Sequence, residues 1–254
     1  GLTLIRLLPE RTLAEVVSFG ERMSSVIVAA MLENAIHHNS LDFIKTEKWF
    51  NRNIADRGLT EKLIKEEFAL PLERHAVAGG FISTDRNTGE ITNLGRGGSD
   101  YTAALIAAAL DADLLEIWTD VDGFLTSDPR IIKEAAIIPS MSFVESMELC
   151  SFGAKVIYPP TIYPVFHKNI PIKILNTFNP TAPGTLISDN APGKGKARGV
   201  SSLNSTSMIS MSGPLASNVA EINSRAYNAM ARNGISVFLV AQPSEEKTFS
   251  IAMP

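Results

Sequence analysis

The chain has 254 residues, of which 45% are hydrophobic and 20% are charged, and its formal net charge at pH 7 is −4. This apolar fraction excludes an intrinsically disordered chain. The acidic balance argues against general nucleic-acid binding, because that activity requires a basic surface. A chain of this length can form one large domain, or a medium-sized domain followed by a small one.

No stretch of the sequence reaches the roughly 18 apolar residues of a membrane span. The first residues also lack the basic start, apolar middle and cleavage site of a signal peptide. We therefore expect a soluble, cytoplasmic protein that does not bind membranes.

Cys150 is the only cysteine, which excludes an intramolecular disulfide and a metal site built from several cysteines. A cysteine of this kind is most often an unreactive core residue in a reducing compartment. None of the histidines has the spacing of a metal ligand. We therefore expect no metal site formed by protein side chains alone.

Short apolar runs rich in Val and Ile alternate with helical patterns along most of the chain. Strands are predicted at residues 13–17, 77–83, 115–119 and 171–176. Helices are predicted to begin near Gly20, Ser99, Phe143 and Pro159. Strands that alternate with helices indicate an α/β domain with a mainly parallel sheet. Turn-forming residues between Ser83 and Asn93 predict a hairpin.

The last part of the chain follows a different pattern. From residue 188 to residue 199 the composition changes to Pro, Gly and basic residues, which predicts a linker. Beyond it, residues 206–212 predict a half-buried strand, and apolar residues recur at helical spacing from Val219 to Met230. Two more strands are predicted at residues 235–242 and 247–254. This β-α-β-β order is the first part of a ferredoxin-like βαββαβ unit.

The most informative motif is GRGGSDYTAALIAAAL at residues 95–110. Its glycines let the backbone approach a ligand closely, and Ser99 is a good N-cap for the Ala- and Leu-rich helix that follows. Free N–H groups and the helix dipole favour an anion here, and the guanidinium of Arg96 suits a carboxylate or phosphate. The alternative is a tight turn with an incidental arginine. The motif is neither a Walker A loop nor a dinucleotide-binding GxGxxG.

A second motif, WTDVDGFLTSDPR at residues 118–130, follows a predicted buried strand. Ligands of open α/β sheets bind beyond the carboxyl ends of strands, where Thr119 and Asp120 stand. Asp128 and Arg130 add a charge pair on a turn. Taken alone, this motif is better explained by a solvated acidic loop.

Two further motifs hold one candidate residue each. In FGAKVIYPPTI, at residues 152–162, Lys155 follows a Gly-Ala step, and its ammonium could act as a point charge for phosphate. In SFGERMSSVIVAAML, at residues 18–32, Glu21 could receive the ammonium group of a ligand. On their own, an exposed lysine and a glutamate in the first turn of a helix are ordinary features.

Together the motifs SFGER, GRGGSDYTA, TDVDG with DPR, and FGAKV closely resemble those of an aspartokinase of the amino-acid kinase family. The part from about residue 199 resembles the first regulatory ACT module of aspartokinases, and its run ISVFLVAQPSEEKTFSI is most similar to bifunctional aspartokinase–homoserine dehydrogenases. The resemblance implies an amino-acid-kinase-type three-layer sandwich over residues 1–190 and part of an ACT module over residues 199–254.

The reaction that this resemblance implies is transfer of the γ-phosphoryl group of MgATP to the β-carboxylate of L-aspartate. The product would be 4-phospho-L-aspartate, a precursor of lysine, threonine and methionine. A carboxylate is ionised at pH 7, so no general base is needed to create the nucleophile. Positioning and positive charge should carry the catalysis, because two anions must meet. By resemblance, the protein would be a homo-oligomer regulated by an amino acid, with threonine favoured over lysine.

The resemblance also implies roles for individual residues. The substrate-binding residues would be Glu21, for the ammonium group, and Arg96, Gly97, Gly98 and Ser99, for a carboxylate. The catalytic residues would be Asp100, which would orient lysines, and Lys155. The nucleotide-binding residues would be Thr119, Asp120, Asp128, Arg130 and Lys155. The allosteric residue would be Gln242, at a position that helps to bind threonine in the bifunctional relatives.

Two departures from the family pattern bear on these roles. Family members often have an aromatic residue where this chain has Leu125, so a contact to the nucleotide would be missing. The K-F-G-G-[ST] loop with which the family begins, and which supplies a lysine to the phosphates, is absent from this sequence. We therefore expect the N-terminal portion of the kinase domain to be missing and the chain on its own to be catalytically impaired.

Two other functions fit part of these features. A non-catalytic, amino-acid-binding regulatory chain of the same family would keep the fold without the phosphate lysine. A glutamate or acetylglutamate kinase would share the fold, but the joint presence of SFGER, GRGGSDYTA and the ACT-like tail argues against it.

Overall fold

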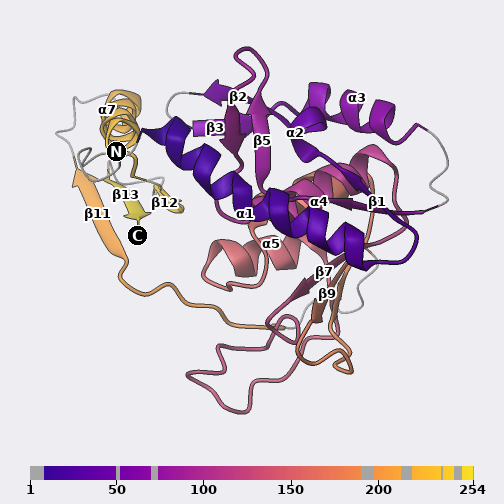
Figure 1. Cartoon of the computed structure of the whole chain (residues 1–254). Coiled ribbons are helices and arrows are strands. Elements are labelled where there is room, and N and C mark those ends of the chain that lie inside the picture. The colour runs from indigo at the N-terminus through magenta and orange to yellow at the C-terminus, as the bar shows by residue number, and fades with distance from the viewer. Residues whose placement is uncertain are drawn as a thin grey trace, which may run out of the picture.

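The computed structural model describes residues 9–49, 52–69, 74–189, 197–212, 219–235, 237–242 and 248–253. Two modules follow one another along the chain (Figure 1). The first, up to residue 189, mixes helices and strands, and the second, from residue 207, is a three-stranded sheet with one helix. Among the described residues, no helix combines the length and the apolar character that crossing a membrane requires.

The helix α1 (Glu10–Met31) runs across the first module as one continuous element (Figure 1). The prediction of a strand at residues 13–17 and of a helix that begins near Gly20 is therefore wrong. The β-branched residues of this stretch favour a strand locally, but burial of a stripe on one face of the helix overrides that preference. The buried stripe consists of the small residues Ala14, Ser18 and Ser25.

Two sheets stand next to α1. β1 (Ala35–His38) and β4 (His75–Ala78) form a parallel pair. A four-stranded sheet has the order β3 (Arg52–Ala55), β2 (Lys45–Trp49), β5 (Ile82–Asp85) and β6 (Ile91–Asn93). The strand predicted at residues 77–83 is thus divided between β4 and β5, and the hairpin predicted between residues 83 and 93 is confirmed by β5 and β6.

A second four-stranded sheet has the order β7 (Leu115–Thr119), β9 (Ile172–Asn176), β10 (Thr185–Ile187) and β8 (Ser140–Met141). β7 and β9 are parallel, as are β8 and β10, whereas β9 and β10 are antiparallel. The strands predicted at residues 115–119 and 171–176 are confirmed. The α/β class is also confirmed, but the sheets are mixed rather than mainly parallel.

The helix α4 (Gly98–Ala109) lies at the centre of the first module, in contact with α3 (Arg57–Glu67) and α6 (Ile162–Phe166). The remaining helical elements are α2 (Ser40–Phe43), α5 (Phe143–Ser151) and the 3-10 turn η2 (Pro159–Thr161). The helices predicted to begin near Ser99, Phe143 and Pro159 are confirmed. The core that joins these elements to the second sheet includes Ala104, Leu115, Ile117, Phe143, Ile172 and Ile174.

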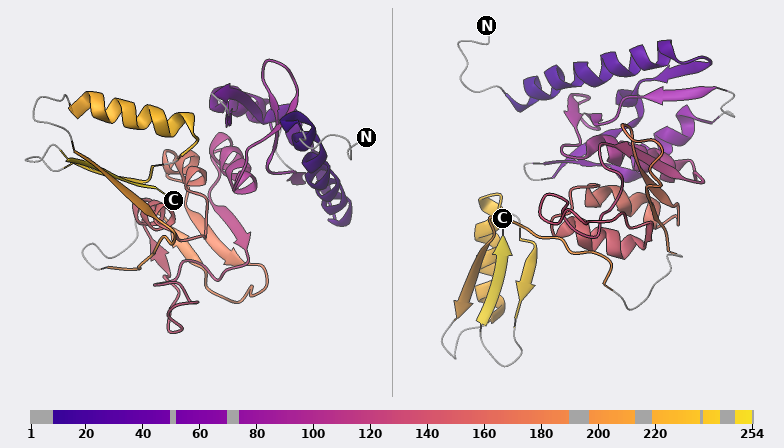
Figure 2. Two further views of the ribbon diagram at one scale, coloured as in Figure 1. Left: turned by 90° about the vertical axis from the view of Figure 1, so that its left-hand side faces the viewer. Right: turned by 90° about the horizontal axis from the view of Figure 1, so that it is seen from below.

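The second module consists of β11 (Ser207–Ser212), α7 (Val219–Arg232), β12 (Leu239–Ala241) and β13 (Thr248–Met253). The strands are antiparallel in the order β11-β13-β12, and α7 covers one side of the sheet (Figure 2). The predicted β-α-β-β order is confirmed, although the third element is shorter than residues 235–242. Of the predicted linker at residues 188–199, the part from 190 to 196 lies outside the described residues.

Candidate functional site

The GRGGS motif forms a tight turn at the start of α4. Gly97 has a left-handed backbone, with φ of 68°, and is the N-cap of the helix. The prediction that Ser99 is the N-cap is therefore wrong, because the helix already begins at Gly98. The N–H of Gly98 donates to the carbonyl of Gly95 at 3.0 Å, so the anion-binding interpretation depends on the helix dipole and on Arg96 rather than on this N–H.

Two glycines between β4 and β5 bring α1 against this turn. A Cβ on Gly79 would lie 3.3 Å from the carbonyl oxygen of Glu21, and a Cβ on Gly80 would lie 2.7 Å from Cα of Ser99. The next residue, Phe81, donates its N–H to Oγ1 of Thr102 in α4, at 3.1 Å. A side chain at Gly80 would collide with Ser99, and one at Gly79 would be tight against α1, so the two glycines let the loop lie between Glu21 and the start of α4.

A first cavity of about 400 Å³ opens in front of the GRGGS turn. Arg96, Gly97 and Asp100 line one side of it, and Lys155 and Tyr158 line the other. Burial raises the pKa of Asp100 above its usual range, because a carboxylate is less well solvated there. Glu21 does not line this cavity, so the structure brings together Arg96, Asp100 and Lys155 but leaves Glu21 behind the Gly79–Gly80 loop.

A second cavity of about 450 Å³ holds the residues of the TDVDG and DPR motifs. Asp128 accepts hydrogen bonds from Arg130, with Nε to Oδ1 at 3.0 Å and Nη2 to Oδ2 at 2.7 Å. This pairing, together with the charge of Lys155, lowers the pKa of Asp128 to about 2. Asp120 also lines the cavity, whereas Thr119 ends β7 and donates its hydroxyl to Oδ1 of Asp120 at 3.2 Å.

Lys155 is the residue that joins the two cavities. The turn formed by residues 153–156 lines both of them, so Lys155 borders the cavity of Arg96 and Asp100 as well as the cavity of Asp128 and Arg130. The structure thus gathers side chains from three of the four predicted motifs around one exposed cation. Leu125, where the family often has an aromatic residue, also lines the second cavity.

Several cavity-lining residues are absent from the sequence-based set. Tyr158 packs on Gly97. Its position three residues after Lys155 is the one feature of the sequence that could have indicated it. Val200, Ser201 and Ser202 line the second cavity, and Leu203 lines the first. These last residues follow the predicted linker, where nothing in the local pattern indicates a site.

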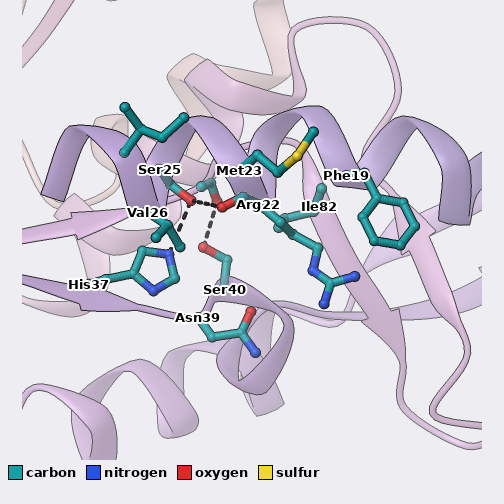
Figure 3. Close-up of a pocket in the computed structure, with 11 residues that line it drawn as sticks. Phe19, Arg22, Met23, Ser25, Val26, His37, Asn39, Ser40 and Ile82 are labelled. Atoms are coloured by element: carbon teal, nitrogen blue, oxygen red, sulfur yellow. Dashed lines mark hydrogen bonds between the residues drawn. The ribbon is translucent and has the colours of Figure 1, made fainter. Parts of the chain in front are cut away.

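A third cavity, about 680 Å³, lies along α1 (Figure 3) and holds none of the predicted site residues. Its walls are mostly apolar, with Ser25 and His37 facing each other. The hydroxyl of Ser25 lies 2.8 Å from the carbonyl oxygen of Glu21, to which it can donate, and 3.0 Å from Nε2 of His37. The tautomer of His37 decides which of the two side chains donates in the Ser25–His37 bond.

In the second module, Gln242 follows β12 and is exposed. Its Oε1 accepts a hydrogen bond from Nδ2 of Asn223, in α7, at 3.3 Å. The side chain therefore lies where the sheet meets the helix.

No group of three or more His, Cys, Asp or Glu side chains among the described residues is arranged to hold a metal ion. The acidic residues of the second cavity are Asp120 and Asp128, and Asp128 forms an ion pair with Arg130. Oxygen ligands of this kind suit a Mg²⁺ ion that is held mainly by the phosphates of a nucleotide.

Comparison with known proteins supports one family. A bifunctional aspartokinase/homoserine dehydrogenase of Haemophilus influenzae is 46% identical over 167 residues, which cover 65% of this chain and 20% of that protein. The corresponding protein of Buchnera aphidicola is 35% identical over 269 residues, which cover all of this chain and 32% of that protein. The chain thus spans a third or less of the length of these two curated relatives.

The fold is also that of solved aspartokinases. The structure of Escherichia coli aspartokinase III in complex with aspartate and ADP superposes with a TM-score of 0.82 at 30% identity, covering 98% of this chain and 56% of that one. The sequence profile of the amino acid kinase family matches residues 4–176. The chain therefore belongs to the amino acid kinase family.

Proposed function

We propose that the chain is the aspartate-kinase part of its protein. It would transfer the γ-phosphoryl group of ATP to the β-carboxylate of L-aspartate. The observation that carries this proposal is the position of Lys155, which borders a cavity with Arg96 and Asp100 and a second cavity with Asp128 and Arg130. Two anionic substrates need such adjacent sites with a cation between them. The E. coli structure that superposes on 98% of the chain is a complex with aspartate and ADP.

The first cavity is proposed to bind aspartate. Arg96 would pair with a carboxylate through its guanidinium, and the start of α4, at Gly97, Gly98 and Ser99, would supply the positive end of the helix dipole. Glu21 would receive the ammonium group if its side chain reaches around the Gly79–Gly80 loop. Asp100 would orient Lys155 rather than remove a proton, because an aspartate carboxylate is already ionised at pH 7.

The second cavity is proposed to bind ATP. Arg130 would contribute positive charge to the phosphates, with its geometry fixed by Asp128 through the bonds at 2.7 and 3.0 Å. Asp120, oriented by the hydroxyl of Thr119, is the carboxylate suited to a Mg²⁺ ion carried by the phosphates. Bound Mg²⁺ would neutralise part of the phosphate charge.

The chemical step needs positioning more than acid–base catalysis. An oxygen of the aspartate β-carboxylate forms a bond to the γ-phosphorus, and the bond between that phosphorus and the β,γ-bridging oxygen breaks, so that ADP leaves. Lys155 is placed to stabilise the charge on the transferred group as it passes between the cavities. No proton has to move in this step. This agrees with cavities that are lined by cationic side chains, glycines and aspartates and need no general base.

We further propose that residues 1–190 form the kinase domain and that residues 199–254 are part of an ACT module which binds an amino-acid effector. The β-α-β-β order and the position of Gln242 between β12 and α7 support this assignment. Threonine is the favoured effector and lysine the second choice. One relative, of E. coli, is a lysine-sensitive aspartokinase, 34% identical over 239 residues. A homo-oligomer in the cytoplasm is the expected state.

The test combines binding and turnover. The chain is titrated with L-aspartate and with MgADP in a calorimeter, and MgATP turnover is followed as ADP release with hydroxylamine to trap the acyl phosphate. Binding of both ligands, or hydroxamate that depends on aspartate, supports the kinase. Binding of aspartate without any binding of nucleotide would favour the alternative, a non-catalytic regulatory chain of the same family. L-glutamate in place of aspartate separates the proposal from other amino-acid kinases.

A further inference from the structure

The segment of residues 198–203, here called the strap, leads from the first module towards β11 without forming helix or strand. Its first residue is firmly attached. Arg198 donates from Nη1 to the carbonyl of Ser140, and its Nε lies 3.5 Å from Oε1 of Glu145. The Arg198 side chain is only 19% exposed. A partly buried arginine with two such partners holds the strap more strongly than an exposed ion pair would.

Glu145 connects this attachment to the start of α5. Its other carboxylate oxygen, Oε2, accepts the N–H of Ser142 at 2.7 Å in the capping box of that helix. α5 ends at Ser151, directly before the turn that carries Lys155. Arg198 therefore fixes the strap to the same helix that positions the Lys155 turn.

The strap then runs along the two loops of the second cavity. The N–H of Val200 donates to the carbonyl of Thr126 at 2.9 Å, in the loop that leads to Asp128. Next, the carbonyl oxygen of Ser202 faces Gly153 so closely that a Cβ on Gly153 would lie 2.2 Å from it. Gly153 has φ of 118°, a backbone conformation that favours glycine. The strap is therefore seated on both the Asp128 loop and the Lys155 turn.

The strap also forms part of the cavity walls. Val200, Ser201 and Ser202 line the second cavity together with Asp128, Arg130 and Lys155, and Leu203 lines the first cavity. Without this segment the second cavity would lose the part of its lining that Val200, Ser201 and Ser202 form. Only Arg198 and Gly199 of the strap belong to the linker predicted at residues 188–199, and the residues that follow them line the two cavities.

We propose that the strap is a binding element of the nucleotide site, with Ser201 and Ser202 in contact with the nucleotide and Arg198 as the positioning residue that holds them there. This inference rests on the proposed function, because it concerns the cavity assigned to ATP. Arg198 lines neither cavity, so it acts through the strap and not by touching the ligand.

The experiment measures the affinity of the 254-residue chain for MgADP by calorimetry, in the wild type and in Arg198→Ala. Loss of the attachment should weaken MgADP binding about ten-fold, which corresponds to the loss of roughly one charge-assisted hydrogen bond. Arg198→Lys keeps the charge and should recover part of the affinity. Ser201→Ala with Ser202→Ala should weaken MgADP binding while leaving the thermal unfolding midpoint unchanged.

Arg86→Ala is the matched control, because Arg86 is also an arginine with two partners, the carboxylates of Glu47 and Asp56, but it lines neither cavity. It should leave the MgADP affinity within about two-fold of the wild type. If Arg198→Ala does not fold, Glu145→Gln removes the charge that faces Arg198 while an oxygen remains for the N–H of Ser142. This variant should also weaken MgADP binding.

The inference is overturned if Arg198→Ala binds MgADP as tightly as the wild type, or if only its unfolding midpoint falls. Peptide-level hydrogen exchange adds a readout that a purely structural role would not change. MgADP should protect residues 198–203 in the wild type, and absence of that protection counts against the strap. If the wild-type chain binds no MgADP, the proposed nucleotide site itself is overturned. If the wild type binds MgADP, the affinities of the variants test the strap alone.

Discussion

Gly97 and Tyr158 are in such close contact that a Cβ on Gly97 would lie 2.3 Å from Cβ of Tyr158. The contact joins the N-cap of α4 to Tyr158, which follows the Lys155 turn, and both residues line the first cavity. Since φ of Gly97 is also 68°, a side chain at this position would be strained by the backbone and by its neighbour together.

Gly97→Ala is therefore predicted to destabilise the chain and to weaken aspartate binding. The left-handed backbone alone costs an alanine about 1–2 kcal/mol, and overpacking against Tyr158 adds about 1–3 kcal/mol. Gly95→Ala is the matched control, because Gly95 has φ of 71° but no atom within 4 Å of the place that its new methyl group would take. Urea unfolding should rank wild type above Gly95→Ala and Gly95→Ala above Gly97→Ala. Equal losses in the two variants would contradict a role for the Tyr158 contact.

The residues of the recognised motifs could be predicted from the sequence, whereas other residues that line the two cavities could not. Arg96, Asp100, Asp128, Arg130 and Lys155 line the two cavities. Their selection rests on the resemblance of their motifs to those of aspartokinases, since the local pattern alone leaves ordinary turns and loops as alternatives. Tyr158 and Ser202 could not be found in this way, since their place depends on contacts with Gly97 and Gly153 that are distant in the sequence.

The fold shows the same division between local and long-range causes. Strands β7 and β9 and helix α4 follow from their apolar runs and from the Ala-rich composition of the helix. The strand expected at residues 13–17 is helical, because the burial of Ala14 and Ser18 against neighbouring strands outweighs the β-propensity of two valines. The intrinsic propensity of the residues suggests a secondary-structure element, and packing against the rest of the protein decides whether that element is a helix or a strand.

Asp100 is predicted to make the stability of the chain depend on pH. Burial raises the pKa of its carboxyl in the folded state, so the folded protein holds this proton to higher pH than the unfolded chain does. Stability should therefore fall as the pH rises from about 3.9, the unfolded value, through the folded value. In Asp100→Asn this contribution should disappear. Urea unfolding of both proteins between about pH 4 and pH 7 measures it, and parallel pH profiles would contradict the assignment.

Asp100→Asn and Arg96→Ala should also differ in their effect on ligand binding. Arg96 lines the first cavity with an exposed guanidinium, so its removal should weaken aspartate binding about ten-fold or more, as expected when a charge-assisted bond is lost. Asp100→Asn should leave aspartate affinity nearly unchanged, because the proposed role of Asp100 is to orient Lys155. Calorimetric titration separates the two, and equal losses would assign Asp100 to substrate binding.

Asp128 is predicted to stay ionised far below neutral pH. Its pKa is lowered to about 2 by the paired guanidinium of Arg130, so this carboxylate contributes to stability above about pH 4 and loses that contribution as the pH falls towards 2. Nuclear magnetic resonance of the ¹³C-labelled carboxyl gives the titration directly. Arg130→Ala removes the guanidinium but keeps the backbone N–H of residue 130, which also donates to Asp128, so the midpoint should rise towards about 3.9 without reaching it. A wild-type midpoint near 4 would show that the pair does not form in solution.

Cys150 is predicted to react slowly with thiol reagents in the folded chain. Burial raises the pKa of its thiol to about 11, so at pH 8 only about one molecule in a thousand carries the reactive thiolate, far below an ordinary cysteine. Since Cys150 lines the first cavity, a bound amino acid should slow the reaction further. Labelling with a chromogenic disulfide, with and without urea, tests this. Fast labelling without urea would contradict the burial.

The last prediction concerns how the two modules hold together. Phe152, beside the Lys155 turn, meets Phe238 of the second module edge to face, with ring centroids 6.1 Å apart and an angle of 87° between the rings. An aromatic pair of this kind contributes about 0.5–1.5 kcal/mol beyond the area that it buries. Phe238→Ala should therefore lower the free energy of unfolding and separate the unfolding of the two modules, because it removes an aromatic contact between them.

Phe178→Ala is the control for this substitution, since the Phe178 side chain is 84% exposed and its removal should change stability by less than about 0.5 kcal/mol. Phe152→Ala and the double variant complete a thermodynamic cycle. A coupling energy near zero would mean that the rings do not interact, whereas a coupling of about 1 kcal/mol would show that the second module presses directly on the turn that carries Lys155. The strap contacts Gly153 and the ring pair includes its neighbour Phe152. The effects of Arg198→Ala and Phe238→Ala on MgADP affinity should therefore not be additive.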